Sequence, residues 1–154
     1  MRRFKQQITE SECLDVLKNE TRGVLALHGE EGYPYAIPMN HWYCEENGRL
    51  YFHGAKEGHK IDSLLKNDKV CYTVFDKGYR KEGEWALNVK SVVIFGRIKT
   101  VTEKDEQIKI CTNLCKKFTD DEDYLNKEIE NSLPRVLCLE LTPEHMTGKL
   151  VNES

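Results

Sequence analysis

The sequence predicts an α+β domain built on an antiparallel β-sheet or barrel, with a few helices at its periphery. About six or seven segments are rich in branched and aromatic residues, and short turns separate several of them, which is typical of antiparallel strands. A few amphipathic stretches lie between these segments and have helical spacing. The 154 residues contain no repeat, low-complexity segment or linker, so we expect a single domain over residues 1–154.

The N-terminal part is expected to form a helix followed by an antiparallel meander. Thr9 and Glu12 have the spacing of a capping box, and the apolar stripe after them predicts a helix over residues 9–20. Three β-rich segments follow and are linked by short turns, one of which contains Asn-Gly. They are residues 22–28, 33–44 and 50–53.

The strand over residues 33–44 is unusual because it contains two prolines, Pro34 and Pro38. Proline has no N–H group to give to a β-ladder, so we expect this strand to lie at a sheet edge or to be bulged near Pro38. A bulge would leave backbone N–H and C=O groups free to face a ligand. The alternative is an irregular edge strand whose aromatic residues only pack in the core.

The rest of the chain alternates between β-rich and helical patterns. Gly96 interrupts a long apolar run, which suggests a bulge or bend. The expected elements are a helix at 61–65, a strand at 69–75, a loop at 76–83, a long β-rich stretch at 85–101, helices at 103–117 and 123–131, and strands at 135–141 and 146–151.

The segment from His53 to Lys60 suggests a phosphate site. It joins a strand end to a helix start, where backbone N–H groups and nearby cations suit an anion. Lys60 supplies charge, His59 can donate a hydrogen bond, and Gly54 and Gly58 allow close approach of the backbone. These could instead be solvated first-turn residues, but a cation there opposes the helix dipole, which suggests that an anion compensates.

Composition and motifs argue against several other classes. A net charge of −3 argues against a broad nucleic-acid surface, and the absence of a signal peptide or long apolar run predicts a cytoplasmic protein outside the membrane. Cys111 and Cys115 fall on one helix face, but two further ligands for a zinc site are missing, so we expect no metal. Ser91 has no recognisable triad partners, and no Walker or GxGxxG motif occurs.

Three segments together resemble the FMN-binding split-barrel superfamily: GYPYAIPMN, YFHGAKEGHKID and SVVIFGR. The resemblance is strongest to the branch of pyridoxamine 5′-phosphate oxidase-related proteins that includes the nitroimidazole-resistance (Nim) proteins. It covers nearly the whole chain, from about Arg2 to Lys149, and its most specific part is the YFHGAKEGHK segment.

The resemblance implies a six-stranded antiparallel split β-barrel of Greek-key type with peripheral helices. It also implies a homodimer with two FMN molecules at its interface. Residues 38–40 would lie along the isoalloxazine ring, 53–55 along the ribityl–phosphate path and the ring edge, and 59–60 at the phosphate. Residues 91–92 would approach the cofactor from the same subunit or from the partner. The implied cofactor-binding residues are Pro38, Met39, Asn40, His53, Gly54, Ala55, His59, Lys60, Ser91 and Val92.

The function that this resemblance implies is an FMN-dependent oxidoreductase that reduces a small organic acceptor, for example a nitro-aromatic compound. The catalytic residue stays unassigned, with His53 as the candidate. The C-terminal residues lack the arginine-bearing segment of pyridoxamine 5′-phosphate oxidase itself, so a vitamin B6 substrate is not implied. Three alternatives stay open: a flavin-binding or redox-sensing module without turnover, a split barrel that binds haem or a deazaflavin, and an interaction domain without cofactor.

Overall fold

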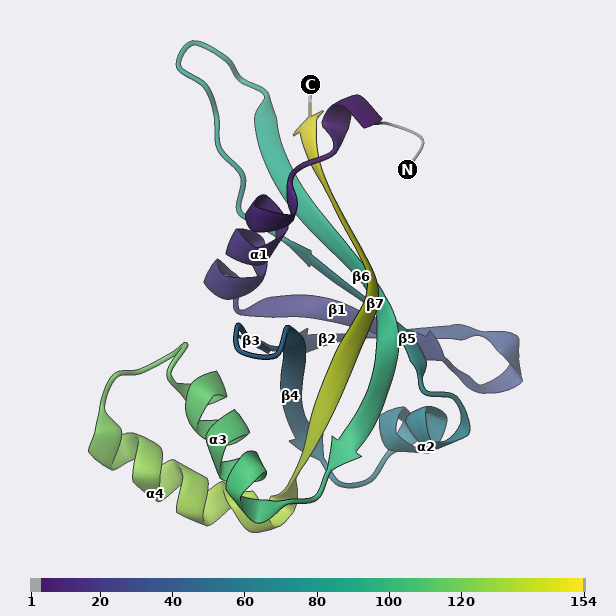
Figure 1. Cartoon of the computed structure of the whole chain (residues 1–154), viewed down its shortest axis with the longest axis vertical. Coiled ribbons are helices and arrows are strands. Elements are labelled where there is room, and N and C mark those ends of the chain that lie inside the picture. Colours follow the sequence, from purple (N-terminus) through teal and green to yellow (C-terminus); the bar gives the residue numbers. More distant parts are fainter. Residues whose placement is uncertain (1–3, 154) are drawn as a thin grey trace.

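The structure is a strongly curved antiparallel sheet with helices around it (Figure 1). It is a computed structural model and describes residues 4–153. Seven strands pair in the order β2-β1-β5-β6-β7-β4-β3, which confirms the predicted antiparallel, mainly β fold. The strands are β1 (Arg22–His28), β2 (Pro34–Asn40), β3 (Trp42–Cys44), β4 (Arg49–Ala55), β5 (Lys69–Phe75), β6 (Leu87–Val101) and β7 (Val136–Glu153).

The single strand predicted over residues 33–44 is divided into β2 and β3 at His41. The backbone N–H of His41 donates to the carbonyl of Thr21 at 3.1 Å, one step beyond the last β1–β2 pair of Arg22 and Asn40, and after it the chain pairs with β4. Because β2 pairs with β1 and β3 pairs with β4, this one segment joins the two ends of the sheet. If β2 and β3 are counted as one strand, the sheet closes into the six-stranded barrel that the resemblance implies.

The two prolines place β2 at an edge and do not cause a bulge. Pairing of β1 with β2 runs without a register shift from Arg22 opposite Asn40 to His28 opposite Pro34. The expected bulge near Pro38 is therefore wrong, and the alternative of an edge strand is correct. The prolines are four residues apart, so both nitrogen atoms face the same side of the strand, which allows the ladder to β1 to continue.

The two strands predicted at 135–141 and 146–151 form one continuous strand, β7. It pairs with β6 from Leu87 opposite Glu153 to Val101 opposite Cys138. The register shifts between Phe95 and Gly96, which confirms the bulge predicted at Gly96. The extra residue of this bulge is Glu144 on β7, because Phe95 pairs with His145 and Gly96 with Pro143, so the Thr-Pro-Glu sequence typical of a turn is accommodated inside a strand.

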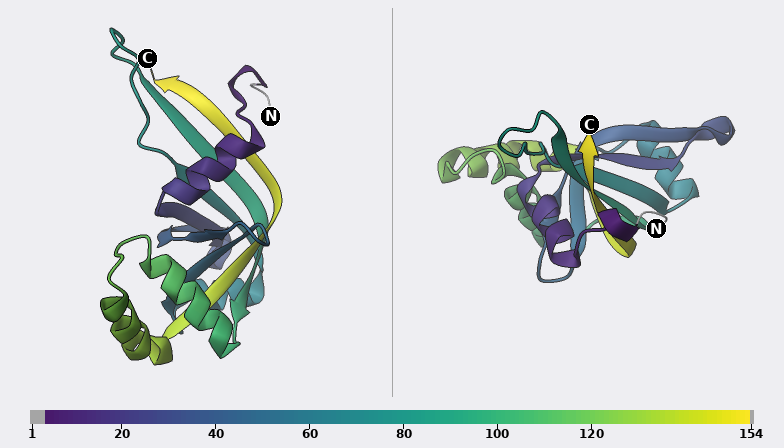
Figure 2. Two further views of the ribbon diagram at one scale, coloured as in Figure 1. Left: turned by 60° about the vertical axis from the view of Figure 1, so that its left-hand side comes forward. Right: turned by 90° about the horizontal axis from the view of Figure 1, so that it is seen from above.

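The helices pack around this barrel and create two apolar clusters. The capping box on α1 is confirmed, since Thr9 and Glu12 exchange both hydrogen bonds. One cluster fills the barrel and includes α1 and α2, whereas the second lies between α3 and the outer face of β3, β4 and β7 (Figure 2). No helix among residues 4–153 is long and apolar enough to cross a membrane. The α-helices are α1 (Glu10–Asn19), α2 (His59–Lys66), α3 (Lys104–Cys115) and α4 (Glu122–Ser132), and short 3₁₀ turns are η1 (Phe4–Gln6), η2 (Glu30–Gly32) and η3 (Leu133–Arg135).

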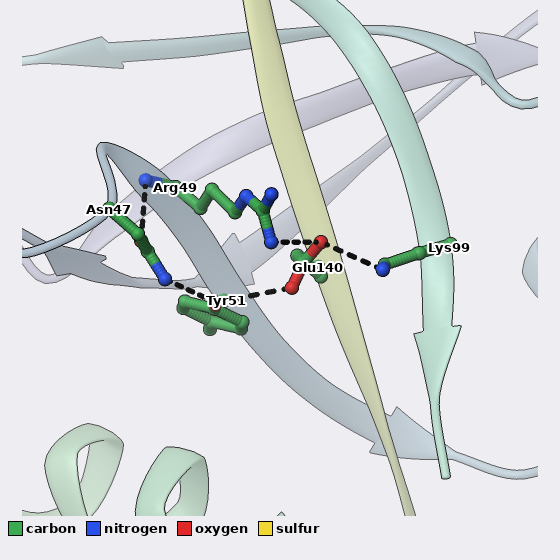
Figure 3. Close-up of polar contacts among 5 residues, drawn as sticks. All are labelled: Asn47, Arg49, Tyr51, Lys99 and Glu140. Atoms are coloured by element: carbon green, nitrogen blue, oxygen red, sulfur yellow. Dashed lines mark hydrogen bonds and ion pairs between the residues drawn. The ribbon is translucent and has the colours of Figure 1, made fainter. Parts of the chain in front are cut away.

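A buried carboxylate ties β4, β7 and β6 together (Figure 3). Glu140 is only 2% exposed, and Tyr51 donates its hydroxyl hydrogen to one carboxylate oxygen at 3.1 Å. The other oxygen lies 3.1 Å from an Arg49 guanidinium nitrogen and 3.2 Å from the Lys99 ammonium. Asn47 donates to the Tyr51 oxygen at 2.9 Å. The charge of Glu140 is thus fully paired, as burial requires.

Candidate functional site

A cleft of about 340 Å³ lies where strands β1, β2 and β4 meet. Its lining residues are Arg22, Pro38, Met39, Asn40 and His53. The structure therefore brings the predicted ring-contacting residues 38–40 together with His53, although 13 residues or more separate them in the chain. Because β2 is an edge strand, it offers unpaired backbone groups at this cleft.

Lys60 lies beside this cleft and extends across Gly54. Its Nζ atom is 3.6 Å from the sulfur of Met39. A Cβ atom built on Gly54 would lie 2.5 Å from the same Nζ, so only glycine leaves room for the ammonium in this position. The fold thus joins Met39 of β2, Gly54 of β4 and Lys60 of α2 in one site, as the phosphate hypothesis expects.

The positive charge at this site has no acidic partner among residues 4–153. Lys60 is half-buried, and burial lowers its pKa, yet no carboxylate oxygen of the described chain lies within 4.0 Å of its nitrogen. Burial, and secondarily the charge of Lys60, also lowers the pKa of His53. A partly desolvated cation without a counter-ion favours an anionic ligand.

The start of α2 adds backbone donors to this charge. Gly58 precedes the helix with φ of 121°, a conformation that favours glycine, and has no side chain to cap the first N–H groups. His59 follows with its ring packed edge-on against Tyr35 of β2, at a centroid distance of 4.5 Å. The N–H groups of Ile61 and Asp62 donate to the Gly58 carbonyl, so those of His59 and Lys60 are the first-turn donors without a helical partner, and the His59 ring places this turn beside β2.

Sequence reasoning missed two polar residues, Arg22 in the cleft and Ser63 on the helix that carries Lys60. Ser63 is buried and its hydroxyl oxygen has no hydrogen-bond partner within residues 4–153. It lies three residues after Lys60, on the same face of α2, which is the only sequence signal for it. Arg22 donates to the side-chain oxygen of Asn40 at 2.9 Å, and this contact depends on the β1–β2 register.

Three predicted site residues are not brought into the cleft of one chain. Val92 is fully buried in the barrel core, and Ser91 pairs with Phe75 and Lys149. His53 pairs instead with Cys138, so on the order of 30 Å of β7 separates the two places. A contribution of Ser91 and Val92 from a partner subunit stays a prediction. Ala55 is exposed at the end of β4, beyond the residues that line the cleft.

The outer face of β2, β1, β5 and β6 carries apolar side chains that neither apolar cluster includes. One cross-strand row continues from the cleft through Pro38, Val24, Thr73 and Val93. Phe95, on the same face of β6, is 54% exposed. Large apolar residues exposed side by side are typical of interaction surfaces.

Comparison with known proteins places this arrangement in a family. The family model described as pyridoxamine 5′-phosphate oxidase matches residues 9–150. No match is found among curated proteins. Several solved structures share the fold at low sequence identity.

Three of these structures illustrate the range. A candidate 5-nitroimidazole antibiotic resistance protein from Bacteroides thetaiotaomicron has a TM-score of 0.78 at 22% identity, over 95% of this chain and 87% of its own. A conserved hypothetical protein from Mycobacterium tuberculosis has a TM-score of 0.81 at 15% identity, over 96% and 88%. A protein from Mesorhizobium loti described as FAD-binding has a TM-score of 0.70 at 21% identity, over 95% and 97%. By its match over most of the sequence and by its fold, the chain belongs to the pyridoxamine 5′-phosphate oxidase-like split-barrel family.

Proposed function

We propose that this protein binds FMN and uses it to reduce a small organic acceptor. The observation that carries the proposal is the half-buried ammonium of Lys60, which has no carboxylate partner in the described part of the chain and extends over Gly54 beside an edge strand. FMN combines a doubly charged phosphate with a flat ring that forms hydrogen bonds, so it needs both a cationic pocket and free backbone groups. The region around Lys60 would supply the cationic pocket, and the edge strand β2 would supply the free backbone groups.

The described residues fit such a cofactor. Lys60 and the first-turn N–H groups of α2 would hold the phosphate, and the hydroxyl of Ser63, which has no partner within residues 4–153, would offer it a further donor. Residues 38–40 would contact the ring through the backbone of β2. When bound, the flavin supplies the redox chemistry, and the protein supplies binding, orientation and electrostatics.

His53 is the residue of this cleft best suited to handle a proton. Its lowered pKa favours the neutral imidazole, which can donate one hydrogen bond and accept another, and its side chain is exposed at the cleft. A neutral His53 also avoids repulsion with Lys60. We assign it the role of a proton donor or acceptor at the acceptor substrate.

We further propose that two copies associate through the outer face of β2, β1, β5 and β6. This face begins at Pro38 in the cleft and continues to the exposed Phe95. A partner lying on it would cover the open side of the cleft and could supply its Ser91, whereas Val92 could take part only through its backbone because its side chain is fully buried. Analytical ultracentrifugation of wild type and Phe95→Glu tests this, and a monomeric wild type at micromolar concentration would contradict it.

The first experiment is the visible spectrum of the purified protein, with mass spectrometry of the released ligand. Flavin bands and an FMN mass support the proposal, and an FAD mass would correct the cofactor, since a similar structure is described as FAD-binding. A Soret band would indicate haem instead. A colourless protein that takes up no added flavin would overturn the proposal.

Lys60→Ala tests the site itself. Loss of a charge-assisted contact worth about 1.5–3 kcal/mol should raise the Kd for FMN by about 10- to 100-fold in a fluorescence titration. Lys66→Ala is the matched control, because Lys66 is on the same helix and pairs with Glu30 at 3.6 Å. Equal affinity of both variants would remove Lys60 from the site.

Turnover is tested separately. The flavin-loaded protein is reduced with dithionite, and nitro-aromatic and quinone acceptors are added one at a time. Reoxidation that saturates with acceptor concentration supports an enzyme. A flavin that no acceptor reoxidises faster than it does free FMN would leave a binding or sensing module.

A further inference from the structure

Two cysteines that are far apart in the sequence meet under α3. The Sγ atom of Cys111 on α3 lies 3.8 Å from the Sγ atom of Cys138 on β7. Both residues are buried, and neither forms a disulfide. The sequence pattern pairs Cys111 with Cys115 on the helix face, but the contact in the fold is with Cys138.

The surroundings of this pair favour reaction at Cys111. Contact with the Cys138 thiol lowers the pKa of Cys111, whereas contact with Cys111 and burial raise the pKa of Cys138, whose thiol can also donate to the carbonyl of Gln107 at 3.9 Å. Cys111 is therefore the member that becomes a thiolate, the nucleophilic form of cysteine. Cys115, one turn further along, has its pKa raised by burial and is a poorer nucleophile.

A path for a small reagent leads to the same cluster. A cleft of about 340 Å³ opens between β3, β4 and α3, and Cys44 and Ile110 are among its lining residues. Both also belong to the apolar cluster that contains Cys111 and Cys138. A small, uncharged oxidant that enters this cleft reaches the edge of the cluster that contains the pair, although neither Cys111 nor Cys138 lines the cleft itself.

We propose that Cys111 and Cys138 form a reversible disulfide when the protein meets a hydroperoxide. A disulfide has an S–S distance of about 2.05 Å, so the sulfur atoms must approach by about 1.8 Å, which is within the reach of side-chain rotation. No pairing of Cys111 with Cys115 is required. The link would join the helix α3 covalently to strand β7.

The chemistry balances in two steps. The Cys111 thiolate attacks the distal oxygen of the hydroperoxide, the O–O bond breaks, and the alkoxide leaves with a proton from water, which gives a sulfenic acid and an alcohol. The thiol of Cys138 then attacks that sulfur, the S–OH bond breaks, and water leaves with the thiol proton. The two thiols lose two electrons in total, and the hydroperoxide gains them.

The disulfide would lie next to the strand that carries His53. Cys138 is the direct cross-strand partner of His53, one of the residues that line the cleft between β1, β2 and β4. A disulfide would therefore fix α3 against the strand that supports His53.

The test is a peptide map of the purified protein after treatment with hydrogen peroxide and alkylation of the remaining thiols. We expect loss of two hydrogen masses, a linked pair of peptides containing Cys111 and Cys138, and full reversal by dithiothreitol. Cys115→Ser should keep the link, and Cys111→Ser should lose it. The wild-type map alone decides the pairing if a variant fails to fold.

Three outcomes would overturn the inference: a link between Cys111 and Cys115, oxidation that stops at a sulfenic or sulfinic acid without a link, or no reaction at peroxide concentrations that oxidise exposed thiols. The map identifies thiols and does not depend on bound flavin. A peptide map without the link would therefore not affect the proposed function, and a failure to bind flavin would not affect the disulfide proposal.

Discussion

Glu140→Gln should destabilise the protein strongly, because the replaced carboxylate accepts three donors and is 2% exposed (Figure 3). Glutamine has the same shape but only one acceptor oxygen, so its NH₂ group must face either a cation or the Tyr51 hydroxyl. The side chains of Arg49 and Lys99 are 40% and 66% exposed and can turn to water. Whichever way the amide turns, one buried donor loses its acceptor: the Tyr51 hydroxyl if the NH₂ group faces it, or the NH₂ group itself if Arg49 and Lys99 turn away to water.

We expect a loss of about 2–3 kcal/mol in the free energy of unfolding, from one charge-assisted hydrogen bond and one buried donor left without an acceptor. For a chain of this size that corresponds to a fall in Tm of about 5–10 °C. Urea unfolding followed by tryptophan fluorescence measures it, and Trp42, which stacks on Tyr51 at 5.2 Å, reports directly on this region.

A double-mutant cycle tests how much of this loss in the free energy of unfolding comes from the contact between Tyr51 and Glu140. Glu140→Gln and Tyr51→Phe should couple by about 1–2 kcal/mol, because the charge-assisted hydrogen bond from Tyr51 to Glu140 is already absent in the Tyr51→Phe background. Glu144→Gln is the matched control, since Glu144 is also on β7 and pairs with an arginine, but its side chain is 45% exposed. The reasoning would be refuted by a coupling near zero, or by a control that loses as much stability as Glu140→Gln.

Three further outcomes are expected. The free energy of unfolding should fall by about 3 kcal/mol as the pH drops from 6.5 to 4. Burial lowers the pKa of His41 from 6.5 to about 4 in the folded protein, so the unfolded chain binds that proton first. Denaturant unfolding at several pH values measures this loss, and His41→Gln should abolish most of it whereas His145→Gln should not. Gly54→Ala should weaken FMN binding by displacing Lys60, with unchanged FMN affinity in a titration as the contrary result. Ser63→Ala should weaken FMN binding by several-fold. It should leave the free energy of unfolding of the flavin-free protein nearly unchanged, because the Ser63 hydroxyl has no partner in the described chain. A loss of stability without loss of affinity would argue against a ligand contact.

Local features of the fold could be predicted from the sequence because they depend on neighbouring residues. The capping box at Thr9 and the bulge at Gly96 are examples, and both are confirmed. The segment from His53 to Lys60 was recognised in the same way, since a strand end, two glycines and a helix start occur within a few residues.

Features that depend on strand register could not be predicted. The contact of Arg22 with Asn40 exists only because β1 and β2 pair in one register, and the meeting of Cys111 with Cys138 requires the placement of α3 over β7. At Pro143 the sequence predicts an interruption that the structure does not have. Its surroundings indicate a turn, but the bulge opposite Gly96 absorbs the irregularity and the strand continues.

Residues 34–44 both close the barrel and contribute to the ligand cleft, so ligand binding and barrel closure depend on the same segment. This segment holds the sheet ends together through β2 and through the three residues of β3, and its residues 38–40 also line the cleft. A ligand held by these backbone groups binds only the closed barrel, so its binding free energy is added to closure by mass action. Amide hydrogen exchange should therefore slow first in this segment as ligand is added, before it slows in the long β6–β7 ladder.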